Sequence, residues 1–261
     1  MRFKITLRAK EPNSVIPINY QYPLSSALYK IIAKGNEQYS EFLHNTGYGR
    51  GFKFFTFSDI RCPFEINGDR LHLKKDEITL SVCFQIPEAM ESFIKGLFGS
   101  EKIDIADRKS KASFQVISVE SLPNPISLHK ENEIIPILLT PLSPIVAGIP
   151  NDRGHYDYFA PDSPRFAENL IYNWRSKIEA CYDEDTAIGA LLILEISPTK
   201  HTFKSRLLTI KAGTKEETKI RGWMNFELKA TAEKRYQDLL LNGGAGLYNA
   251  QGMGCVEVVK D

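Results

Sequence analysis

The chain has 261 residues, 43% of them hydrophobic and 25% charged, which are the proportions of a soluble globular protein with a hydrophobic core. Its formal net charge of +1 gives no overall indication of nucleic-acid binding, so any basic binding surface has to be local. No apolar run approaches the ~20 residues that a membrane-spanning helix needs, and residues 1–5 alternate like a strand, unlike a signal peptide. The four cysteines lie far apart without a CxxC pair, so the sequence predicts a cytoplasmic protein with neither a zinc knuckle nor a disulfide framework.

The first half of the chain predicts a strand, two helices, two strands, a helix and a strand. Residues 3–9 alternate between apolar and polar side chains, the period of a half-buried strand. Ser25 or Ser26 is expected to cap a helix that runs to Lys34, and Asn36 to cap a second helix whose buried face is Tyr39, Phe42 and Leu43. The remaining predicted elements are strands at 52–57, 78–86 and 113–119, a hairpin at 67–69 and a helix at 87–99.

The second half repeats this order. It predicts a strand near 134–146, a helix at 164–180, strands at 189–196, 203–211 and 220–228, a helix at 232–241 and a last strand at 255–259. The loop Leu122-Pro123-Asn124-Pro125 is the natural boundary. We therefore predict an α+β fold of two tandem ferredoxin-like (βαββαβ, RRM-like) domains, at residues 1–122 and 123–261.

A glycine-rich stretch at residues 243–254 precedes the last strand. Glycine tolerates positive φ and lets a backbone approach a ligand closely, so this stretch is either a phosphate-facing loop or an ordinary tight turn. It lacks the third glycine of a dinucleotide fingerprint, no GK[ST] follows it, and the chain contains no GxSxG or HExxH. Residues 183–185 (Asp-Glu-Asp) are better explained as an exposed acidic turn than as a cation site. No metal and no cofactor are expected.

Basic residues concentrate between Lys200 and Arg221. This segment holds seven Lys or Arg, among them Lys204, Arg206, Lys219 and Arg221, against two Glu. A cationic hairpin beside a glycine loop suits a polyanion such as RNA. A solvated hairpin face whose lysines serve solubility explains the same pattern.

His44 is the most informative of the five histidines. At 100° per residue it points away from the predicted apolar face of its helix, so it is not expected to be a packed core histidine. Two interpretations remain open. A cationic histidine stabilises the C-terminus of a helix, and a half-exposed imidazole exchanges protons near neutral pH.

These pieces resemble a known family. Gly244-Ala245-Gly246, five residues, and Gly252-Met253-Gly254 are similar to the GhGxxxxxGhG signature of CRISPR-associated repeat-processing endoribonucleases, the sixth Cas family within the repeat-associated RNA-binding superfamily. Residues 21–24, 27–29, 42–44 and 53–58 resemble the amino-terminal pattern of that family, and residues 142–145 resemble its entry into the second domain.

The resemblance implies metal-independent cleavage of CRISPR repeat RNA in precursor transcripts. The ribose 2′-OH attacks the adjacent phosphorus and leaves a 2′,3′-cyclic phosphate and a 5′-OH. It also implies three catalytic residues: His44 as general base or acid, Lys53 as stabiliser of the phosphoryl charge, and Tyr29 as positioning group. Arg50, in the glycine-rich interval between His44 and Lys53, could replace or assist Lys53. We expect the motif glycines 244, 246, 252 and 254, with Arg50 and the basic hairpin, to bind RNA.

The expected partner is CRISPR repeat RNA, precursor and mature, with other CRISPR-associated subunits as further candidates. We expect a monomer or a homodimer and no membrane association. A non-catalytic RNA-binding subunit of an interference complex is the alternative function, and a general single-strand RNA module is a third. The presence of His44 favours the enzyme.

Overall fold

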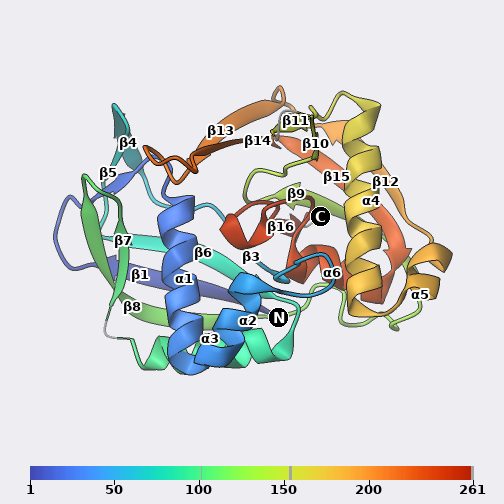
Figure 1. Ribbon diagram of the computed structural model, residues 1–261, viewed down its shortest axis with the longest axis horizontal. Helices are drawn as coiled ribbons and strands as arrows, with labels where there is room; N and C mark the ends of the chain where they lie inside the picture. Colours follow the sequence, from blue (N-terminus) through green and yellow to red (C-terminus); the bar gives the residue numbers. More distant parts are fainter. Residues whose placement is uncertain (101, 153–154, 260–261) are drawn as a thin grey trace.

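The computed structural model describes residues 1–100, 102–152 and 155–259. Two mixed α/β units lie side by side, each built on an antiparallel sheet, with helices α1 and α4 in front of the strands in the view of Figure 1. The last two residues of the predicted second domain, 260 and 261, lie outside the described range.

The first sheet has the strand order β3-β6-β1-β8-β7. Its strands are β1 (Arg2–Ala9), β3 (Phe55–Phe57), β6 (Glu77–Phe84), β7 (Ile103–Ala106) and β8 (Lys111–Leu122). Helices α1 (Gln21–Gly35), α2 (Glu37–Asn45) and α3 (Pro87–Phe98) accompany them. Setting aside the edge strand β7, the chain order is βαββαβ and the strand order is 4-1-3-2, which confirms the predicted ferredoxin-like fold.

The second sheet has the order β12-β15-β9-β16, again 4-1-3-2. Its strands are β9 (Ile134–Pro141), β12 (Ile193–Pro198), β15 (Phe226–Glu233) and β16 (Val256–Val258), and its helices are α4 (Pro164–Cys181) and α6 (Lys234–Gly243). The short 3-10 helix η1 (Asn249–Gln251) lies inside the glycine-rich stretch. The two halves thus share one topology.

Among the described residues, three smaller sheets accompany the two main ones. The strands β2 (Val15–Pro17), β5 (Arg70–Leu73) and β4 (Phe64–Asn67) form a three-stranded sheet, and β10 (Gly148–Pro150) pairs with β11 (Tyr156–Tyr158). The hairpin of β13 (Lys204–Ile210) and β14 (Thr218–Met224) interrupts the second ferredoxin-like unit between β12 and β15. The acidic residues 183–185 are exposed, as expected, but they begin helix α5 (Glu184–Gly189) rather than a turn. Asp183 caps this helix and accepts a hydrogen bond from the Thr186 amide.

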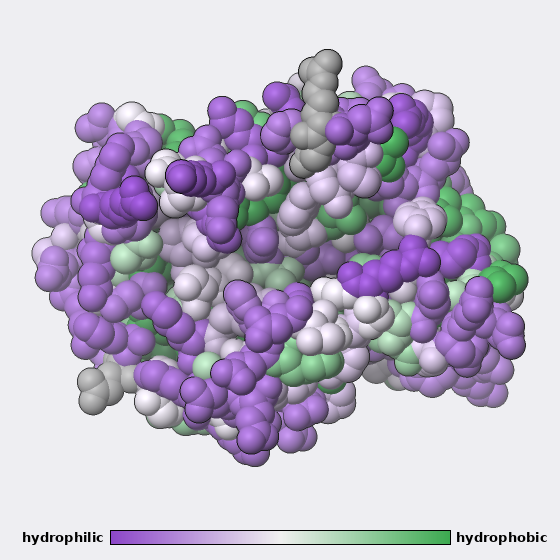
Figure 2. Space-filling view, in the orientation of Figure 1, coloured by the Kyte–Doolittle hydropathy of each residue, from purple (hydrophilic) through white to green (hydrophobic). Residues whose placement is uncertain are grey.

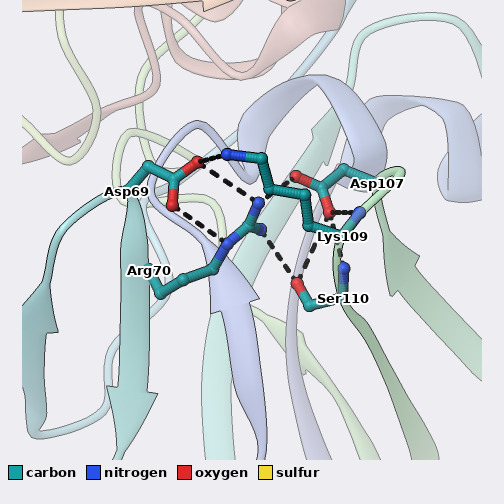
Figure 3. A network of polar contacts seen from close by, with 5 residues as sticks. All are labelled: Asp69, Arg70, Asp107, Lys109 and Ser110. Atoms are coloured by element: carbon teal, nitrogen blue, oxygen red, sulfur yellow. Dashed lines mark hydrogen bonds and ion pairs between the residues drawn. The ribbon is translucent and has the colours of Figure 1, made fainter.

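A polar network attaches the small sheet to the turn between β7 and β8 (Figure 3). Arg70 pairs with Asp107 at 2.7 Å and donates to Ser110, and Lys109 pairs with Asp69 at 2.7 Å. The Lys109 hydrogen bond lowers the pKa of Asp69. Because each cation has a carboxylate partner, this corner adds little free positive charge to the surface.

Each sheet has its own hydrophobic core. The first contains Ile5, Leu28 and Phe93, and the second contains Leu139, Trp174 and Leu239, all buried. In α4 the predicted stripe of Phe166, Leu170, Trp174 and Ile178 is buried, as its spacing of four residues requires. No helix among residues 1–100, 102–152 and 155–259 is long and apolar enough to cross a membrane.

Three local predictions for the first half were wrong. Helix α1 begins at Gln21 rather than at a Ser25 or Ser26 cap, because Pro23 in the first turn has no amide hydrogen that would be left unpaired. Strand β3 starts only at Phe55, because Phe54 has a positive φ of 50° that no extended strand adopts. Phe42 is 36% exposed, so the buried face of α2 consists of Tyr39, Ser40 and Leu43.

The predicted strand at 220–228 is two strands. Asn225 has a φ of 63°, and this left-handed residue separates β14 from β15. Asparagine tolerates that conformation better than most residues, which explains why a break falls there without a glycine.

Candidate functional site

A cleft of about 520 Å³ opens between the two halves, bounded by α1, the segment 50–54, α4 and the glycine-rich stretch. Four predicted functional residues line it besides the motif glycine Gly246: Tyr29, His44, Arg50 and Lys53. In Figure 2 the middle of this face is hollowed and paler than its hydrophilic margin. Residues more than two hundred positions apart in the sequence therefore meet in one cavity.

His44 lies in the last turn of α2, with its side chain exposed as its angular position predicts. Its Nδ1 lies 3.1 Å from the Asn45 side-chain oxygen, which can only accept, so Nδ1 carries the proton in this arrangement. Nε2 is then the nitrogen available for proton exchange. The ring also meets Tyr29 edge-on, with ring centroids 5.8 Å apart at 81°.

Tyr29 is fixed between His44 and the first core, since its ring also packs edge-on against Phe55 at 5.4 Å. Burial raises the pKa of Tyr29, so its hydroxyl stays protonated and acts as a hydrogen-bond donor. A phenol held in this way can orient a phosphate or a base.

Lys53 stands beside the end of α2. Its Nζ donates to the backbone oxygen of His44 at 3.2 Å, which uses one of its three donors and leaves the others for a ligand. Partial burial lowers the pKa of Lys53. The carbonyl end of a helix favours a cation, so α2 helps to hold this ammonium at the cleft.

Arg50 also lines the cleft, but it has protein partners. It donates to the Tyr172 hydroxyl at 2.5 Å and pairs with Glu179 at 3.4 Å, both on α4. Its loop, residues 47–51, is thereby attached to the second half. Arg50 would have to leave these partners in order to replace Lys53 at a phosphate.

The four motif glycines are buried, and only Gly246 lines the cleft. All four have positive φ, between 69° and 87°. A Cβ on Gly246 would lie 2.2 Å from the Val146 oxygen, and a Cβ on Gly252 would lie 2.4 Å from the Phe57 ring. The glycines therefore permit close packing inside the protein. Residues 247–251, with Leu247, Tyr248 and Asn249 among them, form the cleft-facing part of the loop.

The loop is also attached to the first half. Ser25 Oγ donates to the Ala250 oxygen at 2.6 Å, and Thr56 Oγ1 donates to the Met253 oxygen at 2.9 Å. Ser25 precedes Tyr29 by one helical turn of α1. Loop position and Tyr29 position are thus coupled through a single helix.

Two cleft residues of α4, Asn173 and Lys177, were not predicted. Lys177 is 1% exposed and donates to the loop oxygens of Gly244 and Gly246 and to Asn249. The sequence held a signal: Asn173 and Lys177 follow Leu170 by three and seven positions, on the apolar face of the helix. A lysine on an apolar stripe is unusual unless its charge is satisfied inside the protein.

The basic residues of the β13–β14 hairpin differ in their surroundings. Arg206 Nη1 donates to both carboxylate oxygens of Asp59 in the first half, at 3.0 and 2.9 Å, and the Arg206 side chain is only 27% exposed. Lys204, Lys219 and Arg221 are exposed. None of these four residues lines the cleft, so the hairpin extends the cationic surface beyond it.

Within residues 1–100, 102–152 and 155–259, no group of three or more His, Cys, Asp or Glu side chains could hold a metal ion. The side chains of His44, Tyr29, Lys53 and Arg50 supply the cleft with an imidazole, a phenol, an ammonium and a guanidinium.

The two ferredoxin-like units and the glycine-rich loop before the last strand agree with the resemblance to the repeat-associated RNA-binding superfamily. A family model described as CRISPR associated protein Cas6, C-terminal, matches residues 124–258, and one described as CRISPR-associated protein Cas6, N-terminal, matches residues 15–117. The chain is also 31% identical over 185 residues to CRISPR-associated endoribonuclease Cas6 1 of Methanocaldococcus jannaschii, a match covering 70% of this chain and 68% of that protein. The chain belongs to the Cas6 family.

Solved structures agree with this assignment. A structure described as CRISPR associated protein Cas6 is 25% identical, with a TM-score of 0.72 over 100% of this chain and 99% of its own. A Cas6-related protein of Pyrococcus furiosus has a TM-score of 0.80 at 22% identity over 100% of this chain and 99% of its own, and at that identity it supports the fold alone.

Proposed function

We propose that the protein is an endoribonuclease that cleaves CRISPR repeat RNA within precursor transcripts to release guide RNAs. Membership of the Cas6 family supports this activity, and the related Methanocaldococcus protein is named as an endoribonuclease. The observation that carries the proposal is the cleft itself, which combines His44, Tyr29 and Lys53 in one cavity. We also propose that the protein is located in the cytoplasm, as the scattered cysteines lead us to expect.

The proposed reaction needs no metal. The ribose 2′-oxygen attacks the neighbouring phosphorus, the bond from phosphorus to O5′ breaks, and the products are a 2′,3′-cyclic phosphate and a 5′-OH. One proton leaves the 2′-OH and one reaches O5′. His44 is the group in the cleft that can transfer such a proton through Nε2, since its Nδ1 is engaged by Asn45.

Charge accumulates on the nonbridging phosphate oxygens as the 2′-oxygen attacks. The Lys53 ammonium, held at the end of α2, offers its remaining donors to those oxygens. The Tyr29 hydroxyl, kept protonated by burial, donates to the phosphate or to the neighbouring ribose.

RNA outside the cut site is assigned to the loop and the hairpin. Leu247, Tyr248 and Asn249 face the cleft, and Tyr248 offers a ring on which a base can stack. Lys204, Lys219 and Arg221 are exposed and suit contacts with phosphates. Arg206 is assigned to the contact between the halves instead, because Asp59 occupies its guanidinium.

The test uses purified protein and repeat RNA in EDTA. We expect cleavage by the wild type, loss of cleavage in His44→Ala, and uncut RNA when deoxyribose replaces the ribose at the cut site. Lys229→Met, an exposed position on β15, serves as a matched control and should cut like the wild type. Wild-type protein that leaves the RNA intact would refute the enzyme and favour a non-catalytic RNA-binding subunit. Cutting that EDTA abolishes would refute the metal-free mechanism.

A further inference from the structure

The ammonium of Lys177 is enclosed by the glycine-rich loop. Its Nζ donates to the oxygens of Gly244 at 2.6 Å and Gly246 at 3.2 Å, and to Asn249 Oδ1 at 2.7 Å. An ammonium has three donors, so all of them are used within the protein. Lys177 therefore has no donor left for RNA, and its role has to be exercised through the loop.

Asn249, which accepts a hydrogen bond from Lys177, also binds both ends of the glycine motif. Its Nδ2 donates to the oxygens of Ala245 and Met253, each at 3.1 Å, and these are the middle residues of the two glycine pairs. One carboxamide thus bridges both halves of the GhGxxxxxGhG signature while Lys177 holds its oxygen.

Two motif glycines make room for this arrangement. A Cβ on Gly244 would lie 2.6 Å from Asn249 Nδ2, and a Cβ on Gly254 would lie 2.7 Å from the same atom. The spacing of the signature is explained by an amide that sits between its two ends and needs a glycine on each side.

Burying the Lys177 amine is energetically unfavourable, which indicates that this side chain has a specific role. Burial lowers the pKa of Lys177 to about 7, because the interior of the protein disfavours the charged form of the amine. Apolar residues of similar volume often replace buried ionic groups without loss of stability. A lysine retained here has a geometric task, since its three directed hydrogen bonds fix the loop in one conformation.

We propose that Lys177 is a positioning residue for RNA cleavage, holding Asn249 and the loop so that the wall of the cleft formed by residues 247–249 faces His44. This inference rests on the proposed function, because it assigns the cleft as the place of cleavage. Lys177 also affects the position of Tyr29, since the loop is attached through Ala250 to Ser25, which lies one turn before Tyr29 on α1.

The experiment measures single-turnover cleavage of repeat RNA at saturating protein for Lys177→Met, Asn249→Ala and the double variant. Thermal unfolding checks that each variant is folded. Misplacement of reacting groups by small distances lowers rates by up to about 100-fold, so we expect a fall of roughly 10- to 100-fold in each single variant. The double variant should be no slower than the slower single variant, because both changes break the same connection.

Each outcome decides the question. A folded Lys177→Met that cuts at the wild-type rate overturns the inference, as do multiplicative effects in the double variant. If Lys177→Met does not fold, Asn249→Ala decides alone: a slowed rate supports the inference and a wild-type rate overturns it. Wild-type protein that never cuts the repeat overturns the proposed function and this inference with it. Normal cutting by wild type, with His44→Ala inactive and Lys177→Met unaffected, overturns this inference alone.

Discussion

Replacing Gly254 with alanine tests whether the motif glycines are required by packing. Gly254 has a φ of 69°, and a Cβ there would lie 1.9 Å from the Ala245 oxygen. Because real Cβ contacts are longer than 3.0 Å, that oxygen has to move by about 1 Å or more. Ala245 O accepts from Asn249 Nδ2, and the Ala245 amide donates back to Gly254 O at 2.8 Å, so both hydrogen bonds are disturbed.

The expected loss of stability is the sum of these contributions. A left-handed alanine costs about 1 kcal/mol, two weakened hydrogen bonds cost about 1 kcal/mol each, and overpacking adds about 1 kcal/mol or more. We expect Gly254→Ala to lower the free energy of unfolding by about 4 kcal/mol, measured by denaturant titration.

Gly213→Ala is the matched control. Gly213 has nearly the same φ, 72°, but a Cβ at this position would have no neighbouring atom within 4 Å. It should lose only the conformational part, about 1 kcal/mol. Equal losses in the two variants would refute the argument that close approach, rather than backbone conformation, requires glycine at position 254.

Three further predictions concern single side chains. Arg206→Ala should lower the free energy of unfolding by about 2 kcal/mol because both carboxylate oxygens of Asp59 lose the charged donor Nη1. Lys204→Ala should leave the free energy of unfolding unchanged, and equal effects of the two substitutions would contradict this reasoning. Tyr29→Phe keeps the ring contacts but loses the hydroxyl, so single-turnover cleavage should slow about tenfold at unchanged stability; an unchanged rate would remove the hydroxyl from the mechanism. Lys177 has a folded pKa of about 7 against 10.5 unfolded, chiefly through burial and despite the Cys181 thiol nearby. Above pH 7 the unfolded chain therefore binds more protons than the folded chain. From pH 7 to pH 9 the free energy of unfolding of the wild type should rise by about 2 kcal/mol more than that of Lys177→Met. Parallel plots of unfolding free energy against pH for the two proteins would refute this.

Much of the fold could be predicted because it depends on local periodicity. The alternation in β1, the four-residue spacing in α4 and the Asn36 cap of α2 are properties of short windows, and the structure contains all three. Errors arose where a single backbone angle decided the outcome. Nothing in the composition of residues 52–57 or 220–228 indicates that Phe54 and Asn225 adopt positive φ.

Some residues of the candidate site could be predicted from the sequence and others could not. Tyr29, His44 and Lys53 were predicted because a family pattern joins them, and the structure places them in one cleft. Lys177 and the pairing of Arg206 with Asp59 depend on contacts between residues far apart in the chain. The Lys177 contacts form inside the second unit, and the Arg206–Asp59 pair forms only when the two halves pack against each other. A single sequence therefore does not reveal which cation faces RNA and which is bound within the protein.

The shared cleft also determines when this protein can begin to act. Domains fold in order as the ribosome releases them, at ~5–20 residues per second. The first unit, which includes α1, α2 and β3, can form while the loop at 244–254 is still being translated. At that stage His44 and Tyr29 face an open side rather than a wall. A nascent chain would then carry the proposed proton-transfer group without the wall that completes the cleft, so on the proposed function we expect no cleavage before the loop has been synthesised.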